Sequence, residues 1–524
     1  MSRTYRSTMV RQVSPNMPRV TSYALRSASP AKTRADAVVV GVVAGPKGPR
    51  LCDAAADVTA AYGRRLRPFL STMGVTGKAG EAVRTPTRDE VNAPLLVFVG
   101  LGEDPADPIA VRRAAGVAAR NVPNAASVAL SLPSETPELV AAVVEGHRLG
   151  GYTFTAYKSS KSETTEPNDV VVLTPIARKA DAVAALERAE VLADAVALTR
   201  DWVNTPPRDC TPPLLAELVT AAHKEVTKGR GAPKVELEVF DDEQLAEMGC
   251  GGILSVGDSS AAPSRLVKLT WAPQGAVAHL ALVGKGVTFD SGGLTIKPSS
   301  SMVNMKGDMA GAASVVAATL AIARLGLPLK VTAFAPMAEN MVSGTATRPG
   351  DVITMHNGST VEIANTDAEG RMLLGDALSL AVQEEPDVVI DIATLTGHMQ
   401  LALGDKVGAV MGTDDEVQVV LAAGRTAGEQ HWPMPIPEEM KERITSSKIA
   451  DLLQHDWVRW GGGLYASAFL REFTGGLPWA HLDIAGKEIN TGGPYGHVTA
   501  GATGFGVTTL VEIARRLAEG PSRD

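Results

Sequence analysis

Residues 365–371 read Asn365-Thr366-Asp367-Ala368-Glu369-Gly370-Arg371, with two carboxylates and a guanidinium at alternate positions. The apolar pattern that begins at Met372 predicts a helix directly after this stretch. In extended backbone, residues at i, i+2 and i+4 share a face, so we expect Asp367, Glu369 and Arg371 to point into one pocket at a strand end. Adjacent carboxylates raise each other's pKa unless cations lie between them. A pair of metal ions between the carboxylates, with an anion held at Arg371, would balance these charges. The alternative is a surface loop with one Asp/Arg ion pair.

A second group of charged residues follows another predicted strand, upstream in the chain. Lys285 and Asp290 come directly after a short apolar run that suits a buried strand. Lys297 is next, and Asp308 precedes an Ala-rich helical pattern over 310–325, so its carboxylate lies near a helix N-terminus, where negative charge is favoured. Carboxylates gathered at strand ends form the oxygen-rich kind of cluster that divalent cations bind.

With these residues in view, the chain resembles the leucyl aminopeptidases of peptidase family M17, the cytosol aminopeptidases. The resemblance rests on residues 365–371, on Lys285 with Asp290, on Lys297 and on the Asp308 segment, in the family's order and spacing. Further matching segments are 204–207, 336–341, 348–352, 391–397 and 481–486. Ala310 departs from the glycine that the family usually has there, and we expect its small methyl group to be tolerated.

The resemblance implies two adjacent divalent metal ions, Mn²⁺ or Zn²⁺, that activate a shared water and polarise the scissile carbonyl. The positions that match the family's metal ligands are Lys285, Asp290, Asp308, Asp367 and Glu369. Of these, Asp290 and Glu369 match the bridging ligands. A lysine ligand must be neutral, which two nearby cations favour. Without the resemblance, Lys285 is more simply interpreted as an anion-binding lysine.

The remaining site residues also follow from the resemblance. Lys297 matches the cation that stabilises the oxyanion of the tetrahedral intermediate. Arg371 matches the arginine that holds a bicarbonate-like anion, which can shuttle protons as the base. The positions that match the family's substrate pocket are Met305, Asn365, Ala368, Leu395 (through its backbone) and Gly397. For Met305, a core methionine is the alternative.

The predicted function is therefore a two-metal exopeptidase in cytosolic peptide turnover. It would release N-terminal residues because a free α-amine on the substrate would ligate one ion. The preferred N-terminal residues would be leucine and other large apolar residues. The resemblance also implies a homo-oligomer, a hexamer built as two trimers. A non-enzymatic, DNA-binding or regulatory role of the same fold is the alternative, and a two-metal phosphatase is another.

Composition limits the other classes of function. The net charge of −8 does not indicate nucleic acid as a partner, although the DNA-binding alternative remains open. The three cysteines form no C-x-x-C pair, which fits a reducing compartment. We see no apolar run that approaches the length of a membrane span, so we expect a soluble, cytoplasmic protein.

Strand and helix patterns alternate along the chain, which predicts an α/β fold with two domains. Residues 1–35 carry basic and no acidic side chains, and we expect an unstructured tail, with a transit peptide as the alternative. We place a small N-terminal α/β domain, macro-like by resemblance, at 36–175. A linker helix over 176–203 then leads to a larger catalytic α/β domain at 204–518, with a central mixed sheet covered by helices.

Overall fold

The computed structural model describes residues 21–122, 124–159 and 167–520. The chain divides into two compact units, Met1–Ala193 with Pro494–Thr499, and Asp194–Gly493 with Ala500–Asp524. Helix α5 (Ala180–Asn204) continues across this division. The two-domain α/β architecture predicted from the sequence is confirmed, and each unit has its own sheet.

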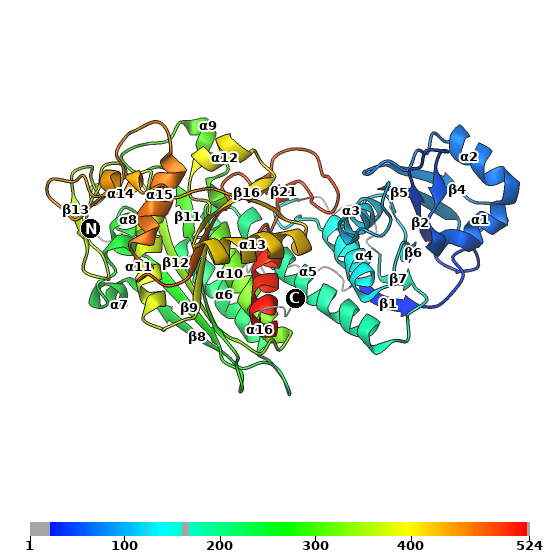
Figure 1. The fold of residues 1–524 in the computed structure, drawn as a ribbon, viewed down its shortest axis with the longest axis horizontal. Coiled ribbons are helices and arrows are strands. Elements are labelled where there is room, and N and C mark those ends of the chain that lie inside the picture. The colour runs from blue at the N-terminus through cyan, green and yellow to red at the C-terminus, as the bar shows by residue number, and fades with distance from the viewer. Residues whose placement is uncertain (1–20, 123, 160–166, 521–524) are drawn as a thin grey trace. The chain divides into compact units, whose positions relative to one another are not determined.

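The smaller unit is built on one sheet with the strand order β1-β7-β6-β2-β5-β4, in which β3 pairs with β2. Its strands are β1 (Ser22–Arg26), β2 (Ala37–Val43), β3 (Arg50–Leu51), β4 (Ala82–Pro86), β5 (Leu95–Gly102), β6 (Ser127–Ser131) and β7 (Asp169–Leu173). Its helices are η1 (Asp53–Ala55), α1 (Ala56–Tyr62), η2 (Gly63–Arg65), α2 (Leu66–Thr72), α3 (Pro108–Ala119) and α4 (Pro137–Gly150). Helices α3 and α4 lie on one side of the sheet, and α1 and α2 on the other (Figure 1).

One expectation for this unit is corrected. Part of the segment predicted as an unstructured tail is strand β1, which pairs in parallel with β7, because alternate residues of Ser22–Arg26 can pack on the sheet. Residues 1–20 of that predicted tail lie outside the described part of the chain. Helix α1 ends before Gly63, whose φ of 53° is a conformation that ends a right-handed helix.

The larger unit has a central mixed sheet with the strand order β17-β16-β19-β15-β10-β12-β9-β8 and β11 paired with β12. Its strands are β8 (Val235–Phe240), β9 (Arg265–Trp271), β10 (His279–Gly284), β11 (Gly286–Asp290), β12 (Lys330–Asn340), β15 (Val388–Ala393), β16 (Val407–Gly412), β17 (Gln430–Pro433) and β19 (Trp479–Asp483). Two small sheets are formed by β13 (Val352–Thr354), β14 (Thr360–Glu362) and β18 (Leu452–Leu453), and by β20 (Ile489–Asn490) and β21 (Gly501–Ala502).

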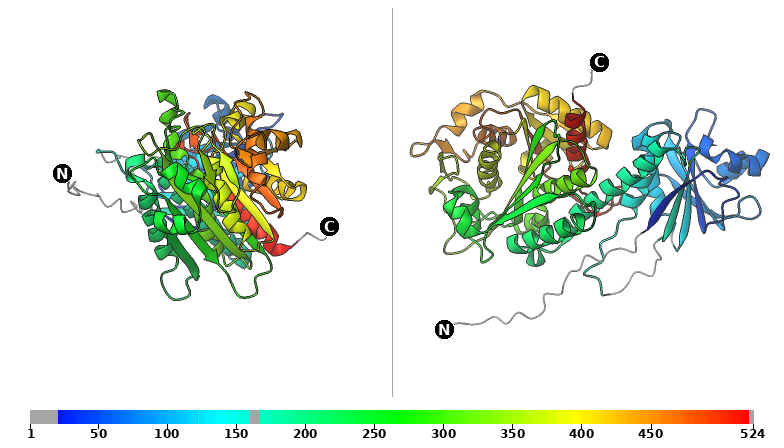
Figure 2. Two further views of the ribbon diagram at one scale, coloured as in Figure 1. Left: turned by 90° about the vertical axis from the view of Figure 1, so that its left-hand side faces the viewer. Right: turned by 90° about the horizontal axis from the view of Figure 1, so that it is seen from below.

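Helices cover both faces of the central sheet. In Figure 1, α10 and α16 lie on one side of the central strands and α11 and α15 on the other, and Figure 2 shows this layering from two further directions. The helices are η3 (Pro207–Asp209), α6 (Pro212–Val226), α7 (Asp242–Glu247), α8 (Gly251–Gly257), α9 (Ser299–Met302), η4 (Met305–Gly307), α10 (Ala310–Arg324), α11 (Gly370–Val382), α12 (Gly397–Leu403), α13 (Asp414–Ala427), α14 (Glu439–Ile444), α15 (Gly462–Arg471) and α16 (Val507–Glu519). The strands between the layers are almost continuously apolar, as expected for a sheet that is buried on both faces.

One segment, Met305–Arg324, is long and apolar enough to cross a membrane by length and composition, which the sequence reading did not anticipate. In this structure it contains the central helix α10, and 89% of its most apolar window is buried. Every α10 residue before Arg324 is buried, including Ala310. The apolar character of this segment is therefore that of a buried core helix.

Candidate active site

The acidic and basic residues of the two predicted groups meet at the carboxyl ends of parallel strands. Strand β10 runs parallel to both β12 and β15, and β15 runs parallel to β19. Lys285 directly follows β10, and Asp290 is the last residue of β11. Ligands bind at this edge of open α/β sheets because the loops there diverge and leave a crevice.

Lys285 lies at the centre of the first charged group. Its Nζ is 2.7 Å from Asp308 Oδ1 and 2.8 Å from Glu369 Oε1. It also donates a hydrogen bond to the carbonyl oxygen of Thr394, at 3.0 Å. Thr394 Oγ1 donates to the same Asp308 Oδ1 at 2.7 Å, so one loop contacts both members of the ion pair. The backbone of Gly370 permits this arrangement, since a Cβ there would lie 2.5 Å from Lys285 Cε.

Lys297 forms the second charged group. Its Nζ is 2.6 Å from Asp290 Oδ2 and also pairs with Asp367 Oδ1. The other oxygen of Asp290 accepts hydrogen bonds from Asn340 Nδ2 and from the backbone N–H of Gly292, each at 2.8 Å. Gly292 has a φ of 84°, and a Cβ on it would lie 2.8 Å from Asp367 Oδ1, so the tight turn requires glycine.

Burial and charge act together on the pKa values in the site. The side chains of Lys285, Asp290 and Glu369 are at most 4% exposed. Burial, and then the charge of Asp290, raises the pKa of Asp367 to about 6. Burial also raises the pKa of Asp308 well above its ordinary value, whereas Lys285 and Lys297 outweigh burial at Glu369 and lower its pKa.

Four carboxylates face only two ammonium groups here, which leaves an excess of negative charge in a desolvated site. Asp290, Asp367 and Glu369 offer oxygens that all lie within 4.8 Å of one another. Asp308 Oδ2 is buried and accepts no hydrogen bond from any described residue. A carboxylate oxygen in that situation is costly unless a cation binds it. The donor set of carboxylates therefore fits divalent cations.

Among these neighbours Lys285 is favoured as an ammonium ion. Burial alone would lower the pKa of Lys285, but the carboxylates of Asp308, Glu369 and Asp290 outweigh burial and raise it. Lys285 is the counter-ion of Asp308 and Glu369 in this arrangement, whereas a lysine that ligates a metal ion is neutral. Cations placed between the carboxylates would reverse the sign of the effect.

Arg371 does not share a face with Asp367 and Glu369, which corrects the expectation of an extended backbone. Glu369 has φ −70° and ψ −34°, and Arg371 lies in the first turn of α11. Its Nη1 donates to the carbonyl oxygen of Gln454 at 2.7 Å, and its guanidinium carbon lies 5.6 Å from the ring centroid of Tyr465. Arg371 Nε is buried and has no hydrogen-bond partner among the described residues, so a donor remains available for an anion.

The five predicted substrate-binding residues are half-buried or exposed. Met305, Asn365, Ala368 and Leu395 are half-buried, and Gly397 is exposed. Asn365 and Ala368 belong to the turn that carries Asp367. Leu395 belongs to the loop that carries Thr394, and Gly397 begins α12 directly after that loop. Met305 begins η4, close in sequence to Asp308. A Cβ added at Gly397 would have no described atom within 4 Å, so the start of α12 faces open space.

Several polar residues that hold this site together were not singled out from the sequence. Asn340 ends β12, pairs with Asp290 in the sheet register and also donates to the Thr366 carbonyl at 2.9 Å. Gln454 Oε1 accepts from the backbone N–H of Asn365 at 3.1 Å, and its Nε2 donates to Ala368 at 2.9 Å. Asn340 lies within the segment 336–341 that matches the family, which is the signal that could have identified it.

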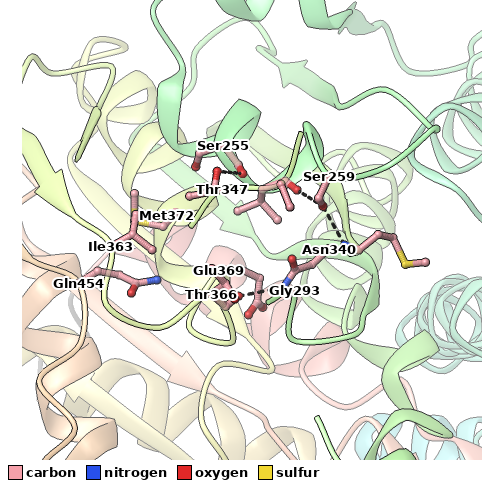
Figure 3. Close-up of a pocket in the computed structure, with 13 residues that line it drawn as sticks. Ser255, Ser259, Gly293, Asn340, Thr347, Ile363, Thr366, Glu369, Met372 and Gln454 are labelled. Atoms are coloured by element: carbon pink, nitrogen blue, oxygen red, sulfur yellow. Dashed lines mark hydrogen bonds between the residues drawn. The ribbon is translucent and has the colours of Figure 1, made fainter. Parts of the chain in front are cut away.

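A small pocket lies beside Glu369, on one side of the 365–371 turn. Figure 3 shows Asn340, Thr366 and Glu369 together at its wall, with Ser259 and Thr347 nearby. Its volume is about 20 Å³, which is room for roughly one water molecule and too little for an amino-acid side chain. We therefore do not assign it to a substrate residue.

The comparisons with known proteins agree with this geometry. The family model of the cytosol aminopeptidase catalytic domain matches residues 197–511, and that of the family's N-terminal domain matches residues 39–161. The chain belongs to the cytosol aminopeptidase family, M17. It is thus an aminopeptidase, which is a class of hydrolase.

Curated relatives match over almost their whole length. A probable cytosol aminopeptidase of Streptomyces coelicolor is 44% identical over 96% of this chain and 99% of its own length. One of Nocardia farcinica is 45% identical over 92% of this chain and 95% of its own. Among solved structures, the bottromycin maturation enzyme BotP in complex with Mn has a TM-score of 0.81 and 37% identity, over 93% of this chain and 100% of that chain.

Proposed function

We propose that this chain is a two-metal exopeptidase that removes N-terminal residues from peptides, preferably leucine and other large apolar residues. The observation that carries the proposal is the buried cluster of four carboxylates and two lysines, in which Asp308 Oδ2 has no hydrogen-bond partner among the described residues. That one similar structure was solved with Mn supports Mn²⁺ among the candidate ions. The names of the relatives support cytosolic peptide turnover as the setting.

The residues that would hold the two ions are those predicted from the sequence, Lys285, Asp290, Asp308, Asp367 and Glu369. When bound, such a pair lowers the pKa of water toward neutrality and polarises a carbonyl. Within the chain, Asn340 and the Gly292 N–H hold one oxygen of Asp290, which leaves its Oδ2 directed toward Lys297. Thr394 holds Lys285 and Asp308 from the opposite side.

Two cationic residues would act on the reacting groups. The Lys297 ammonium is half-buried beside the acidic cluster, where it can donate to an oxyanion that develops on the scissile carbonyl. The Nε–H of Arg371 can donate to a bicarbonate-like anion, which would accept and return the proton of the attacking water. Gly397 is exposed, and the space beside it would let a substrate side chain approach this end of α12.

We expect leucine p-nitroanilide to be hydrolysed in the presence of Mn²⁺. Chelation should lower the rate by on the order of 100-fold or more, because both carbonyl polarisation and water activation are lost. Release of p-nitroaniline, measured before chelation, after it and after Mn²⁺ is returned, tests this. N-acetyl-leucine p-nitroanilide is the matched control and should not be cleaved.

Metal-dependent turnover of p-nitrophenyl phosphate without cleavage of the anilide would instead favour a phosphatase. Absence of any metal-dependent hydrolysis would favour the DNA-binding role. No observation on the described residues favours that role, and every predicted ligand position carries a side chain that can ligate a cation.

We further propose that the protein is a cytoplasmic homo-hexamer of two trimers. The support is family membership, since the implied assembly belongs to the family as a whole. Sedimentation should give about six times the subunit mass of 54.6 kDa. A stable monomer that is fully active at nanomolar concentration would contradict this proposal.

A further inference from the structure

Asp483, the last residue of β19, is a fully buried carboxylate that accepts four hydrogen bonds from two short segments. Its Oδ1 accepts from the backbone N–H of Leu395 at 3.2 Å and of Ala485 at 3.1 Å. Its Oδ2 accepts from the backbone N–H of Thr396 at 3.1 Å and from the Thr396 hydroxyl at 2.8 Å. Three of the four donors belong to the loop that follows β15.

That loop contacts Lys285 and Asp308 of the site. Ala393, the last residue of β15, is opposite Asp483 in the sheet register, so the carboxylate reaches the residues just beyond the strand end. The next residue, Thr394, accepts from Lys285 Nζ through its carbonyl and donates to Asp308 Oδ1 through its hydroxyl. The loop therefore has two sets of contacts: Asp483 accepts hydrogen bonds from Leu395 and Thr396, and Thr394 contacts Lys285 and Asp308.

We propose that Asp483 is a positioning residue for the Lys285/Asp308 half of the site and for the loop that precedes α12. This inference rests on the proposed two-metal function. Asp483 makes no hydrogen bond or ion pair with Asp290, Asp367 or Glu369 among the interactions described here, so its hydrogen-bonded path to the site passes through Thr394 and through the backbone of Leu395 and Thr396. The charge of Asp483 also acts on Arg371, whose pKa it raises against the effect of burial.

The chemistry of the carboxylate is suited to this task. Both of its oxygens face donors, and it accepts without offering a proton of its own. An asparagine in the same place would present an NH₂ group on one side. At the Oδ1 position the NH₂ would face the backbone N–H groups of Leu395 and Ala485, and at the Oδ2 position it would face the backbone N–H of Thr396, whose hydroxyl can accept from it. In either orientation a backbone N–H of the loop loses its acceptor, and we expect the loop to shift away from Lys285 and Asp308.

Asp391 offers a matched control in the neighbouring strand. It is also fully buried, and it accepts from Trp479 Nε1 at 2.6 Å and pairs with His481 Nδ1 at 2.5 Å. Those partners are core side chains of β19 and do not belong to the 394–397 loop. Asp391→Asn should therefore reproduce the loss of a buried acceptor without the loss of loop position.

The test is a calorimetric titration of Mn²⁺ into the metal-free full-length protein and its variants, beside kcat and KM for leucine p-nitroanilide. We expect Asp483→Asn to weaken one of two Mn²⁺ sites by roughly 10- to 100-fold, with the other unchanged, as for residues that orient ligands. Its kcat should partly recover at high Mn²⁺. Asp391→Asn should lower thermal stability and leave both Mn²⁺ sites as in the wild type.

A smaller change keeps the test informative if Asp483→Asn fails to fold. Thr396→Val removes only the hydroxyl donor, and we expect it to weaken the same Mn²⁺ site by a few-fold. Two Mn²⁺ sites of wild-type affinity in Asp483→Asn would overturn the inference about Asp483 and leave the proposed function standing. If Asp483→Asn does not fold, the same result in Thr396→Val would do so. Equal weakening of a Mn²⁺ site by Asp391→Asn would also overturn the inference. A wild-type protein that neither binds two ions nor cleaves the anilide would overturn the proposed function, and this inference with it.

Discussion

Glu369→Gln is expected to bind about one divalent ion per subunit in place of two. Glu369 Oε1 lies 2.8 Å from Lys285 Nζ, and one of its oxygens is within 4.8 Å of oxygens of Asp290 and Asp367. The substitution removes a negative charge from the middle of this buried cluster and keeps the side-chain volume. Because hard cations depend on anionic oxygen ligands, we expect turnover to fall by roughly 1000-fold or more.

Metal analysis by mass spectrometry, beside steady-state kinetics, measures both effects. The control is Glu429→Gln, since Glu429 accepts hydrogen bonds from Gly506 and Thr509 and takes no part in the acidic cluster. That variant should keep two ions and its activity. Two ions per subunit in Glu369→Gln would show that Glu369 is not a metal ligand.

The second large effect is expected for Lys297→Ala, with the opposite result for metal content. Removing the ammonium takes positive charge away from Asp290 and Asp367, so binding of cations should persist or strengthen. If Lys297 donates to the developing oxyanion, its loss should lower kcat by roughly 100- to 1000-fold, or about 3 to 4 kcal/mol, with a smaller change in KM.

Lys268→Ala is the matched control. Lys268, in β9, is a half-buried lysine whose side chain is 20% exposed, against 15% for Lys297. Its Nζ lies 2.6 Å from Glu384 Oε1, outside the acidic cluster. It should retain full turnover. A loss of metal in Lys297→Ala would assign Lys297 to the structure of the metal site, and unchanged turnover would remove it from the chemistry.

The sequence by itself determined the local elements and the composition of the site. The Ala-rich pattern expected to be helical over 310–325 is helix α10 (Ala310–Arg324), because its propensity and apolar content are carried within the segment. The apolar run before Lys285 is the buried strand β10. Placing chemistry at strand ends was therefore possible from residue order, since the carboxyl ends of parallel strands lie at one edge of the sheet.

Only the tertiary structure decided which charges pair. Lys285 pairs with Asp308 and Glu369, and Lys297 with Asp290 and Asp367, although sequence order alone allows other pairings. Arg371 turns toward Gln454 and Tyr465 because the backbone is already helical at Glu369. The spacing of the acidic stretch indicated an extended backbone, in which Arg371 would share a face with Asp367 and Glu369.

The same holds for the residues that support the site. Asp483 and Leu395 are separated by 88 positions in the chain, yet they meet because β15 and β19 are neighbours in the sheet. Periodicity describes which face a residue occupies within its own element. Contacts between elements depend on strand order and on how the loops beyond the strands fold, and these are set by packing of the whole unit.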